Sequence, residues 1–176
     1  MPRPKVSLKE FEAKLVGVPE TEFIRLAAFI DGEGCITICR SPRRGAAASN
    51  QHELKMTVSN TSLRLFDWLM STFGGNVRRA HNQSYLPVYS WVLNELQAEV
   101  IIRRCLPYFI IKREQAEVAL AFRDLKTRKR LNFNNSRLTP LMLMQRDELH
   151  DKIRSLNGAR SRFAPKAALA MEKEGA

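Results

Sequence analysis

The stretch "RLAAFIDGEGCITI", residues 25–38, joins an apolar helical segment to an alternating, strand-like run through an acidic, glycine-rich joint. The joint places Asp31 and Glu33 at the end of the predicted helix, where the helix macrodipole disfavours negative charge. Capping of neighbouring backbone groups is the favoured explanation for Asp31. Glu33 calls for a nearby cation, and Mg²⁺ fits because it takes one or two carboxylates together with water and phosphate oxygens.

The composition favours a polyanionic partner. Lys and Arg number 29 against 18 Asp and Glu, for a formal charge of +11, so the field of the protein attracts polyanions at long range. Nucleic acid is the leading partner, and a membrane surface is the weaker alternative, since no basic amphipathic helix carries an aromatic apolar face. We expect an intracellular, soluble protein without a membrane partner, because there is no secretory signal and no run of about 18 apolar residues.

Apolar periodicity continues along the chain and predicts a mixed domain. "HELKMTVSN" alternates as a second strand, a helix follows from Leu63, and two further strands and further helices lead to Asn157-Gly158. This order predicts an α+β domain in which the strands form one antiparallel sheet. We expect an N-terminal appendage over 1–20, a single domain over 21–158 and a basic tail over 159–176.

Alternation along the strands predicts a sheet with one apolar and one polar face. If Ile36, Met56 and Trp91 pack against the helices, the other face is polar. Its predicted outward residues are Thr37, Cys39, Lys55, Thr57, Arg78 and Ser90. A two-stranded β-ribbon fits the major groove of DNA, so these residues are candidate DNA contacts, although a merely solvated sheet face is an equally good explanation of the pattern alone.

"LAAFIDGEG", Leu26–Gly34, resembles the signature of the LAGLIDADG homing endonucleases, and the predicted element order is similar to their αββαββα core. The resemblance implies that fold, with a saddle-like DNA-binding sheet and here an extra C-terminal helix. It further implies an intron-homing nuclease that makes a metal-dependent double-strand break in a long pseudo-palindromic target and leaves short 3′ overhangs. The alternative on the same fold is a non-cutting protein, either an intron RNA maturase or a transcriptional regulator.

The resemblance assigns roles to particular residues. Glu33 occupies the position of the metal-binding acid, with the carbonyl of Gly32 as a second ligand, and Mg²⁺ is the expected ion, which Mn²⁺ or Ca²⁺ can replace. Asn60 and Arg64 in "VSNTSLRLF" match the polar and basic residues of the solvent pocket beside the scissile phosphate, and Lys112 in "LPYFIIKREQA" matches a catalytic lysine. A helix cap for Asn60 and a plain surface cation for Arg64 are the alternatives.

One signature in the chain implies a homodimer, because two motif helices pack side by side in this family. The residues expected at that interface are Leu26, Ala27, Ala28, Ile30 and Asp31. Beyond the sheet, Arg43, Arg44 and Arg160 are expected to contact double-stranded DNA, and intron RNA is a further partner that the resemblance allows. It also implies a location in bacterial or phage cytoplasm or in an organelle.

Overall fold

Over the residues that the structure describes, the chain folds as six α-helices and a four-stranded antiparallel sheet. The structure is a computed structural model that describes residues 7–41, 51–79, 87–132 and 139–158. The helices are α1 (Leu8–Val16), α2 (Glu20–Glu33), α3 (Leu63–Thr72), α4 (Glu95–Cys105), α5 (Arg113–Asn132) and α6 (Pro140–Leu156), with a 3₁₀ turn over Leu106–Tyr108. The strands are β1 (Gly34–Ser41), β2 (Gln51–Asn60), β3 (Asn76–Arg79) and β4 (Tyr89–Leu93). The predicted α+β class is confirmed.

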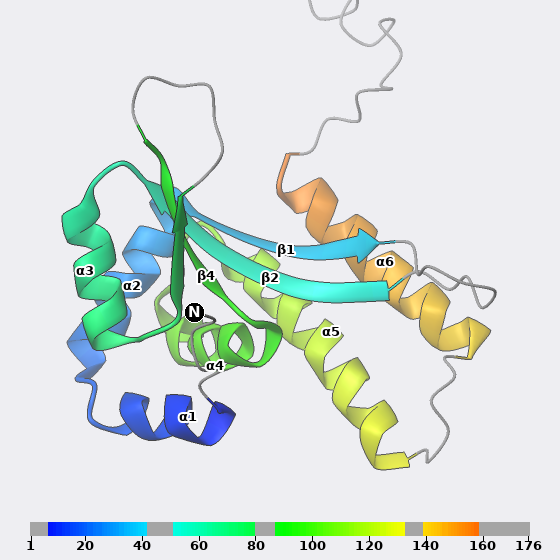
Figure 1. Cartoon of the computed structure of the whole chain (residues 1–176). Coiled ribbons are helices and arrows are strands. Elements are labelled where there is room, and N and C mark those ends of the chain that lie inside the picture. Colours follow the sequence, from blue (N-terminus) through cyan, green and yellow to red (C-terminus); the bar gives the residue numbers. More distant parts are fainter. Residues whose placement is uncertain (1–6, 42–50, 80–86, 133–138, 159–176) are drawn as a thin grey trace, which may run out of the picture.

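The sheet has the order β1-β2-β4-β3, and every neighbouring pair is antiparallel. Strand β4 pairs only with Met56–Asn60 of β2, whereas β1 pairs with β2 from Gln51 to Val58. The β1–β2 hairpin therefore extends beyond the rest of the sheet as a two-stranded ribbon, with α4 and α5 below it in Figure 1.

The two faces of the sheet differ as the alternation predicts. Ile36, Met56 and Trp91 are fully buried against the helices. The outward residues are exposed or half-buried: Thr37, Cys39, Lys55, Thr57, Arg78 and Ser90. The register pairs Thr37 with Lys55 and Arg78 with Ser90, so residues far apart in the sequence lie side by side on this polar face.

Helix α1 is part of the core. Ser7 caps the helix reciprocally with Glu10, and Phe11 and Leu15 are each only 2% exposed within the hydrophobic cluster of the fold. Burying side chains of this size stabilises a fold by about 1.5–3 kcal/mol each. The description of residues 1–20 as an appendage is therefore wrong for α1, while the outer domain boundaries stay a prediction.

Gly34 makes the direct passage from α2 into β1 possible. Its backbone is extended, so no unusual dihedral requires glycine there. A Cβ at this position would lie 2.6 Å from the carbonyl oxygen of Ile30, which is far inside van der Waals contact. Close approach, not a left-handed turn, therefore explains this glycine, and it holds Glu33 directly beside the first residue of the sheet.

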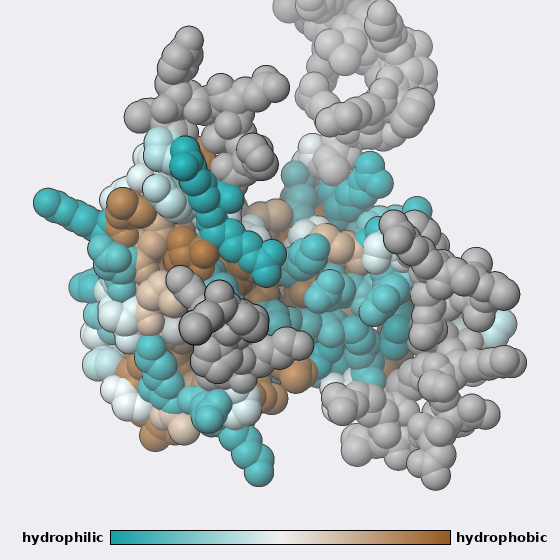
Figure 2. All heavy atoms as spheres, viewed as in Figure 1, coloured by the Kyte–Doolittle hydropathy of each residue, from teal (hydrophilic) through white to brown (hydrophobic). Residues whose placement is uncertain are grey.

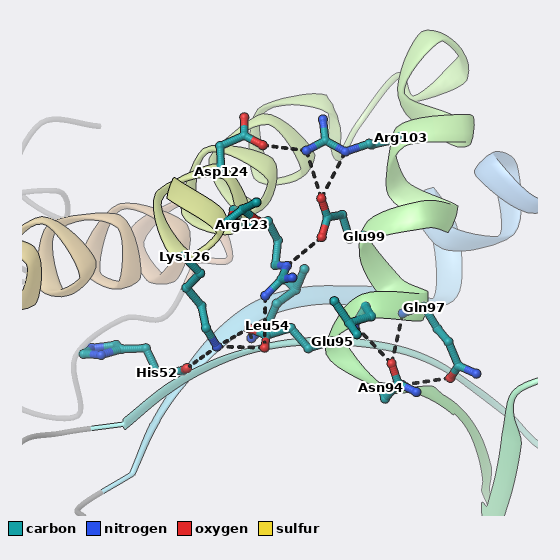
Figure 3. Close-up of polar contacts among 12 residues, drawn as sticks. His52, Leu54, Asn94, Glu95, Gln97, Glu99, Arg103, Arg123, Asp124 and Lys126 are labelled. Carbon is teal, nitrogen blue, oxygen red and sulfur yellow. Dashed lines mark hydrogen bonds and ion pairs between the residues drawn. The ribbon is translucent and has the colours of Figure 1, made fainter. Parts of the chain in front are cut away.

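Side chains from α4 and α5 satisfy the inner edge of the hairpin where β4 no longer pairs with it (Figure 3). A carboxylate oxygen of Glu95 accepts a hydrogen bond from the Leu54 N–H at 3.2 Å, and the Lys126 amine donates to the His52 carbonyl at 3.2 Å. Glu95 and Lys126 also pair with each other at 2.7 Å. The ion pair thus replaces the missing strand and leaves these backbone groups closed to another chain.

A buried arginine holds this charged cluster together. Arg123 is 5% exposed and contacts Glu95 at 3.1 Å and Glu99 at 2.8 Å. Glu99 also accepts from the exposed Arg103. The hairpin therefore lies on a rigid, charge-balanced support.

Among the described residues, no helix is both long and apolar enough to cross a membrane.

Candidate functional site

Asp31 is an internal cap. One carboxylate oxygen accepts from the N–H groups of Ile110 at 2.8 Å and Ile111 at 3.2 Å, and the other accepts from the Lys112 N–H at 2.9 Å. These groups lead into α5, whose N-terminus carries unsatisfied N–H groups and partial positive charge. The prediction that Asp31 caps backbone groups is confirmed, although its partners lie about eighty residues away in sequence rather than in its own turn.

Lys112 compensates the negative end of α2. Its amine donates a short hydrogen bond to the main-chain carbonyl oxygen of Asp31, one of the last carbonyls of the helix. Burial raises the pKa of the Cys35 thiol, and the nearby charge of Lys112 opposes that rise. The ammonium group therefore lies between the end of α2 and the start of β1, which supplies the local reason for a lysine at the start of α5.

Glu33 ends α2 as an exposed side chain. No ion pair or hydrogen bond to it is present within the described residues, in contrast to Asp31 two positions earlier. Those residues also contain no cluster of three or more His, Cys, Asp or Glu side chains suited to a metal. A single carboxylate fits a Mg²⁺ site that substrate phosphates and water complete, because Mg²⁺ is usually held by one or two carboxylates in that way.

Asn60 and Arg64 line one cavity of about 350 Å³ between α2 and the β2–α3 junction. The Asn60 side chain accepts from the Ser62 N–H at 2.9 Å, which closes the turn before α3, but the N-cap of α3 is Ser62 and no side chain caps that helix. The helix-cap alternative for Asn60 is therefore wrong, and the Asn60 amide nitrogen has no hydrogen bond to the described residues. Arg64 is exposed. Both side chains line the cavity, so a role in ordering solvent there stays a prediction.

Other residues in that cavity escaped the sequence analysis. Arg25 and Phe29 of α2 and Trp68 of α3 form its wall, and the Arg25 guanidinium lies 5.8 Å from the centre of the Trp68 ring. The i, i+4 spacing of Arg25 and Phe29 just before the acidic joint is the signal that could have identified them.

The four predicted catalytic side chains fall into two groups. Glu33 and Lys112 lie at the α2 terminus, while Asn60 and Arg64 line the neighbouring cavity. Gly34 pairs with Val58 across the sheet, so Asn60 is two residues from the strand position that faces the end of α2. The structure thus places the two groups at the same end of the sheet.

The outer face of the sheet is the candidate nucleic-acid interface. Figure 2 shows mainly hydrophilic residues over the part of the molecule where β1, β2 and α5 lie in Figure 1, and a mixture of apolar and hydrophilic residues over α3. The predicted contacts Thr37, Lys55 and Arg78 all belong to this polar face. Arg43, Arg44 and Arg160 lie outside the described residues.

The predicted interface residues of α2 need correction. Leu26, Ala27 and Ile30 are fully buried and Asp31 is 8% exposed, so these side chains pack inside their own chain and cannot meet a second one. Ala28 is exposed, as that prediction requires. It shares the outer side of α2 with two further residues at i±4 spacing, Ile24 and Gly32.

Comparison with protein families identifies a matching family model. The model described as "LAGLIDADG endonuclease" matches residues 26–137, from within α2 to beyond the end of α5. A search of the curated proteins gave no match.

Solved structures share the fold. The homing endonuclease I-CvuI, in complex with the I-CreI target in the presence of 2 mM Mg with the DNA not cleaved, is 25% identical, with 81% of this chain and 86% of that chain covered and a TM-score of 0.64. The DNA complex of the group I intron-encoded I-CeuI is 15% identical, covers 88% and 81%, and has a TM-score of 0.64. I-SmaMI, described as a LAGLIDADG homing endonuclease bound to cleaved DNA, is 18% identical, covers 91% of this chain but only 49% of its own, with a TM-score of 0.62.

Proposed function

The chain belongs to the LAGLIDADG endonuclease family, and from that premise we propose that it is a site-specific homing endonuclease that makes a Mg²⁺-dependent double-strand break in a long pseudo-palindromic target. The observation that carries the proposal is Glu33, an exposed carboxylate without a partner among the described residues, held at the negative end of a helix. A bound cation would stabilise such a carboxylate, and Mg²⁺ bound to substrate phosphates is a cation of the right kind.

The chain's own residues then have distinct tasks. The Glu33 carboxylate and the Gly32 carbonyl would hold the ion, and a bound divalent ion would supply Lewis-acid chemistry at the scissile phosphate and at an attacking water. The Lys112 ammonium group, fixed by the Asp31 carbonyl, stabilises negative charge that develops on the phosphate. Asn60 and Arg64 orient solvent in the cavity that they line. Cutting across the minor groove leaves short 3′ overhangs.

Two copies form the active enzyme in this proposal. The outer side of α2 offers the small residues Ala28 and Gly32, and the large apolar side chains of Ile24, Ile110 and Ile111 are 47%, 89% and 67% exposed. Burying such groups stabilises association. The chain also spans about half of I-SmaMI, so a homodimer matches that protein in size.

A leucine at Gly32 tests the dimer. An added Cβ at Gly32 has nothing within 4 Å, and the same holds at Gly17, which follows α1. Both Gly32→Leu and Gly17→Leu therefore leave the monomer fold intact. We expect light scattering to show a monomer for Gly32→Leu and a dimer for the wild type and Gly17→Leu; a dimer in all three would contradict the α2 interface.

Cleavage is tested on a pool of double-stranded DNA with a randomised central segment. With Mg²⁺ the wild type is expected to cut a subset of sequences on both strands, and with a chelator it is not. Glu33→Gln is expected to bind the same sequences without cutting. If Glu33→Gln cuts as the wild type does, the proposed chemistry is wrong, and if the wild type binds specific sequences without cutting in Mg²⁺, the non-cutting alternative is correct.

A further inference from the structure

An acidic side chain stands on the polar face of the hairpin. Glu53 of β2 lies opposite Cys39 of β1 and two residues from Lys55 on the same face. Its side chain is exposed, while its strand neighbours His52 and Leu54 are buried on the other side. Within the described part of the chain, Glu53 has no ion-pair partner. The sequence analysis passed over it in favour of the basic residues.

A carboxylate at this position opposes general DNA binding. DNA affinity comes largely from neutralised phosphates, and a chain with a formal charge of +11 would bind more tightly with a neutral or basic residue here. Other carboxylates of the hairpin region are paired: Glu95 with Lys126 and Asp147 with Arg40. An unpaired acid on the DNA-facing surface therefore needs a hydrogen-bond donor that the DNA itself supplies.

The groove that admits a two-stranded ribbon, the major groove, presents base donors of this kind. Glu53 lies in the part of the hairpin that β4 does not reach, a two-stranded ribbon of the kind that the major groove admits. Cytosine presents its N4 amino group there, and adenine presents N6 beside the N7 acceptor. The second carboxylate oxygen would be repelled by N7, so cytosine is the better partner.

Accordingly, we propose that Glu53 determines specificity for a cytosine in each half of the target, by accepting a hydrogen bond from the cytosine N4 amino group. This inference rests on the proposed function, since it needs sequence-specific binding of DNA. The small side chain of Cys39 across the ladder leaves the Glu53 carboxylate open to the groove.

The substitution Glu53→Gln changes the expected base while keeping the size of the side chain. Glutamine forms a bidentate pair with adenine N6 and N7. The matched control is Glu117→Gln, an exposed glutamate on α5 away from the outer sheet face. Wild type and both variants are used to select binders from the same pool of duplex DNA with a randomised central segment, and the selected pools are sequenced.

The wild type and Glu117→Gln are expected to select cytosine over other bases at one position per half-site by about 10- to 100-fold, the usual discrimination of one good base contact. Glu53→Gln is expected to move that preference to adenine at this position alone. If Glu53→Gln selects the same base as the wild type at every position, the assignment is overturned while the proposed function stands. If the wild type selects no sequence, both are overturned.

Discussion

Below the β1–β2 hairpin, Glu95, Arg123 and Lys126 of α4 and α5 pair with one another or with strand backbone. On the outer face of the hairpin, Glu53 and Lys55 have no hydrogen-bond partner among the described residues. The same contrast separates Asp31, with its three backbone donors, from the exposed Glu33. Polar groups with partners inside the fold maintain its shape. Polar groups without such partners are available for an external ligand. Substitutions of the first kind of group should therefore lower the stability of the fold, and substitutions of the second kind should change ligand binding.

The largest expected loss of stability comes from Arg123→Met. The Arg123 side chain is 6% exposed and balances Glu95 and Glu99. Its removal leaves these half-buried carboxylates with less compensation and costs about 3 kcal/mol. Urea unfolding measures the change. The control is Arg103→Gln: its side chain is 46% exposed, and the expected cost is at most about 1 kcal/mol. Equal costs would show that the cluster is not a closed, buried unit.

Asp31→Asn should come next. An amide offers one acceptor oxygen where the carboxylate offers two, so at least one N–H of residues 110–112 loses its partner, at about 2 kcal/mol. For a chain of this length, that lowers the melting temperature by roughly 4–8 °C. Glu33→Gln, two residues away, should change the free energy of unfolding by less than about 0.5 kcal/mol. Calorimetry on both variants measures the two changes. If Glu33→Gln destabilised the fold as much as Asp31→Asn, the distinction between a carboxylate with partners and one without would be wrong.

Periodicity in the sequence predicted the features that depend on residues close together in the chain: the face of a strand on which a side chain lies, and the end of a helix. Alternation separated Ile36 and Met56 from Thr37 and Lys55 correctly, and the positive φ of 63° at Gly158 follows α6 where the Asn157-Gly158 pair predicted an end. The single carboxylate Glu33 could be singled out because a helix C-terminus disfavours it.

What the sequence could not predict depends on distant partners. The cap formed by Asp31 needs the backbone of residues 110–112, and the Glu95–Lys126 support becomes visible only when the strand order places the short β4 beside β2. Likewise, Leu26 and Ile30 belong to an apolar motif, and only the packing of the core shows that they face inward rather than toward a second chain.

The next effect is a dependence of stability on pH. Burial lowers the pKa of His52, against the hydrogen bond to Asp147, which raises it; the charges of His150 and Arg146 lower it further. The unfolded chain, with an ordinary histidine pKa of about 6.5, therefore takes up a proton before the folded chain does. The contribution of neutral His52 to stability is complete above about pH 6.5 and declines as the pH falls toward its lower folded pKa.

His52→Phe tests that dependence, because phenylalanine cannot titrate. We expect the free energy of unfolding of the wild type to fall more steeply than that of the variant as the pH is lowered from about 7 to about 5.5, the range around the histidine pKa. Urea unfolding at several pH values measures both slopes. Identical slopes would mean that His52 takes up its proton equally readily in the folded and the unfolded chain, and that burial beneath the hairpin does not lower its pKa.

The smallest expected effect distinguishes the roles of Glu53 and Lys55, the two charged residues of the outer face that have no partner among the described residues. Lys55 should contact phosphate, so Lys55→Gln weakens binding to all DNA sequences alike, and the salt dependence of log K becomes shallower by about 0.9 for each phosphate that the variant no longer neutralises. Lys152→Gln, an exposed lysine on α6, should leave the slope unchanged. Binding isotherms at several salt concentrations measure it. We expect a Glu53 variant to change the base preference and a Lys55 variant to change the salt dependence, because a base edge carries sequence information and a phosphate does not. If Lys55→Gln altered the preferred base instead, Lys55 would contact bases in the groove rather than phosphate.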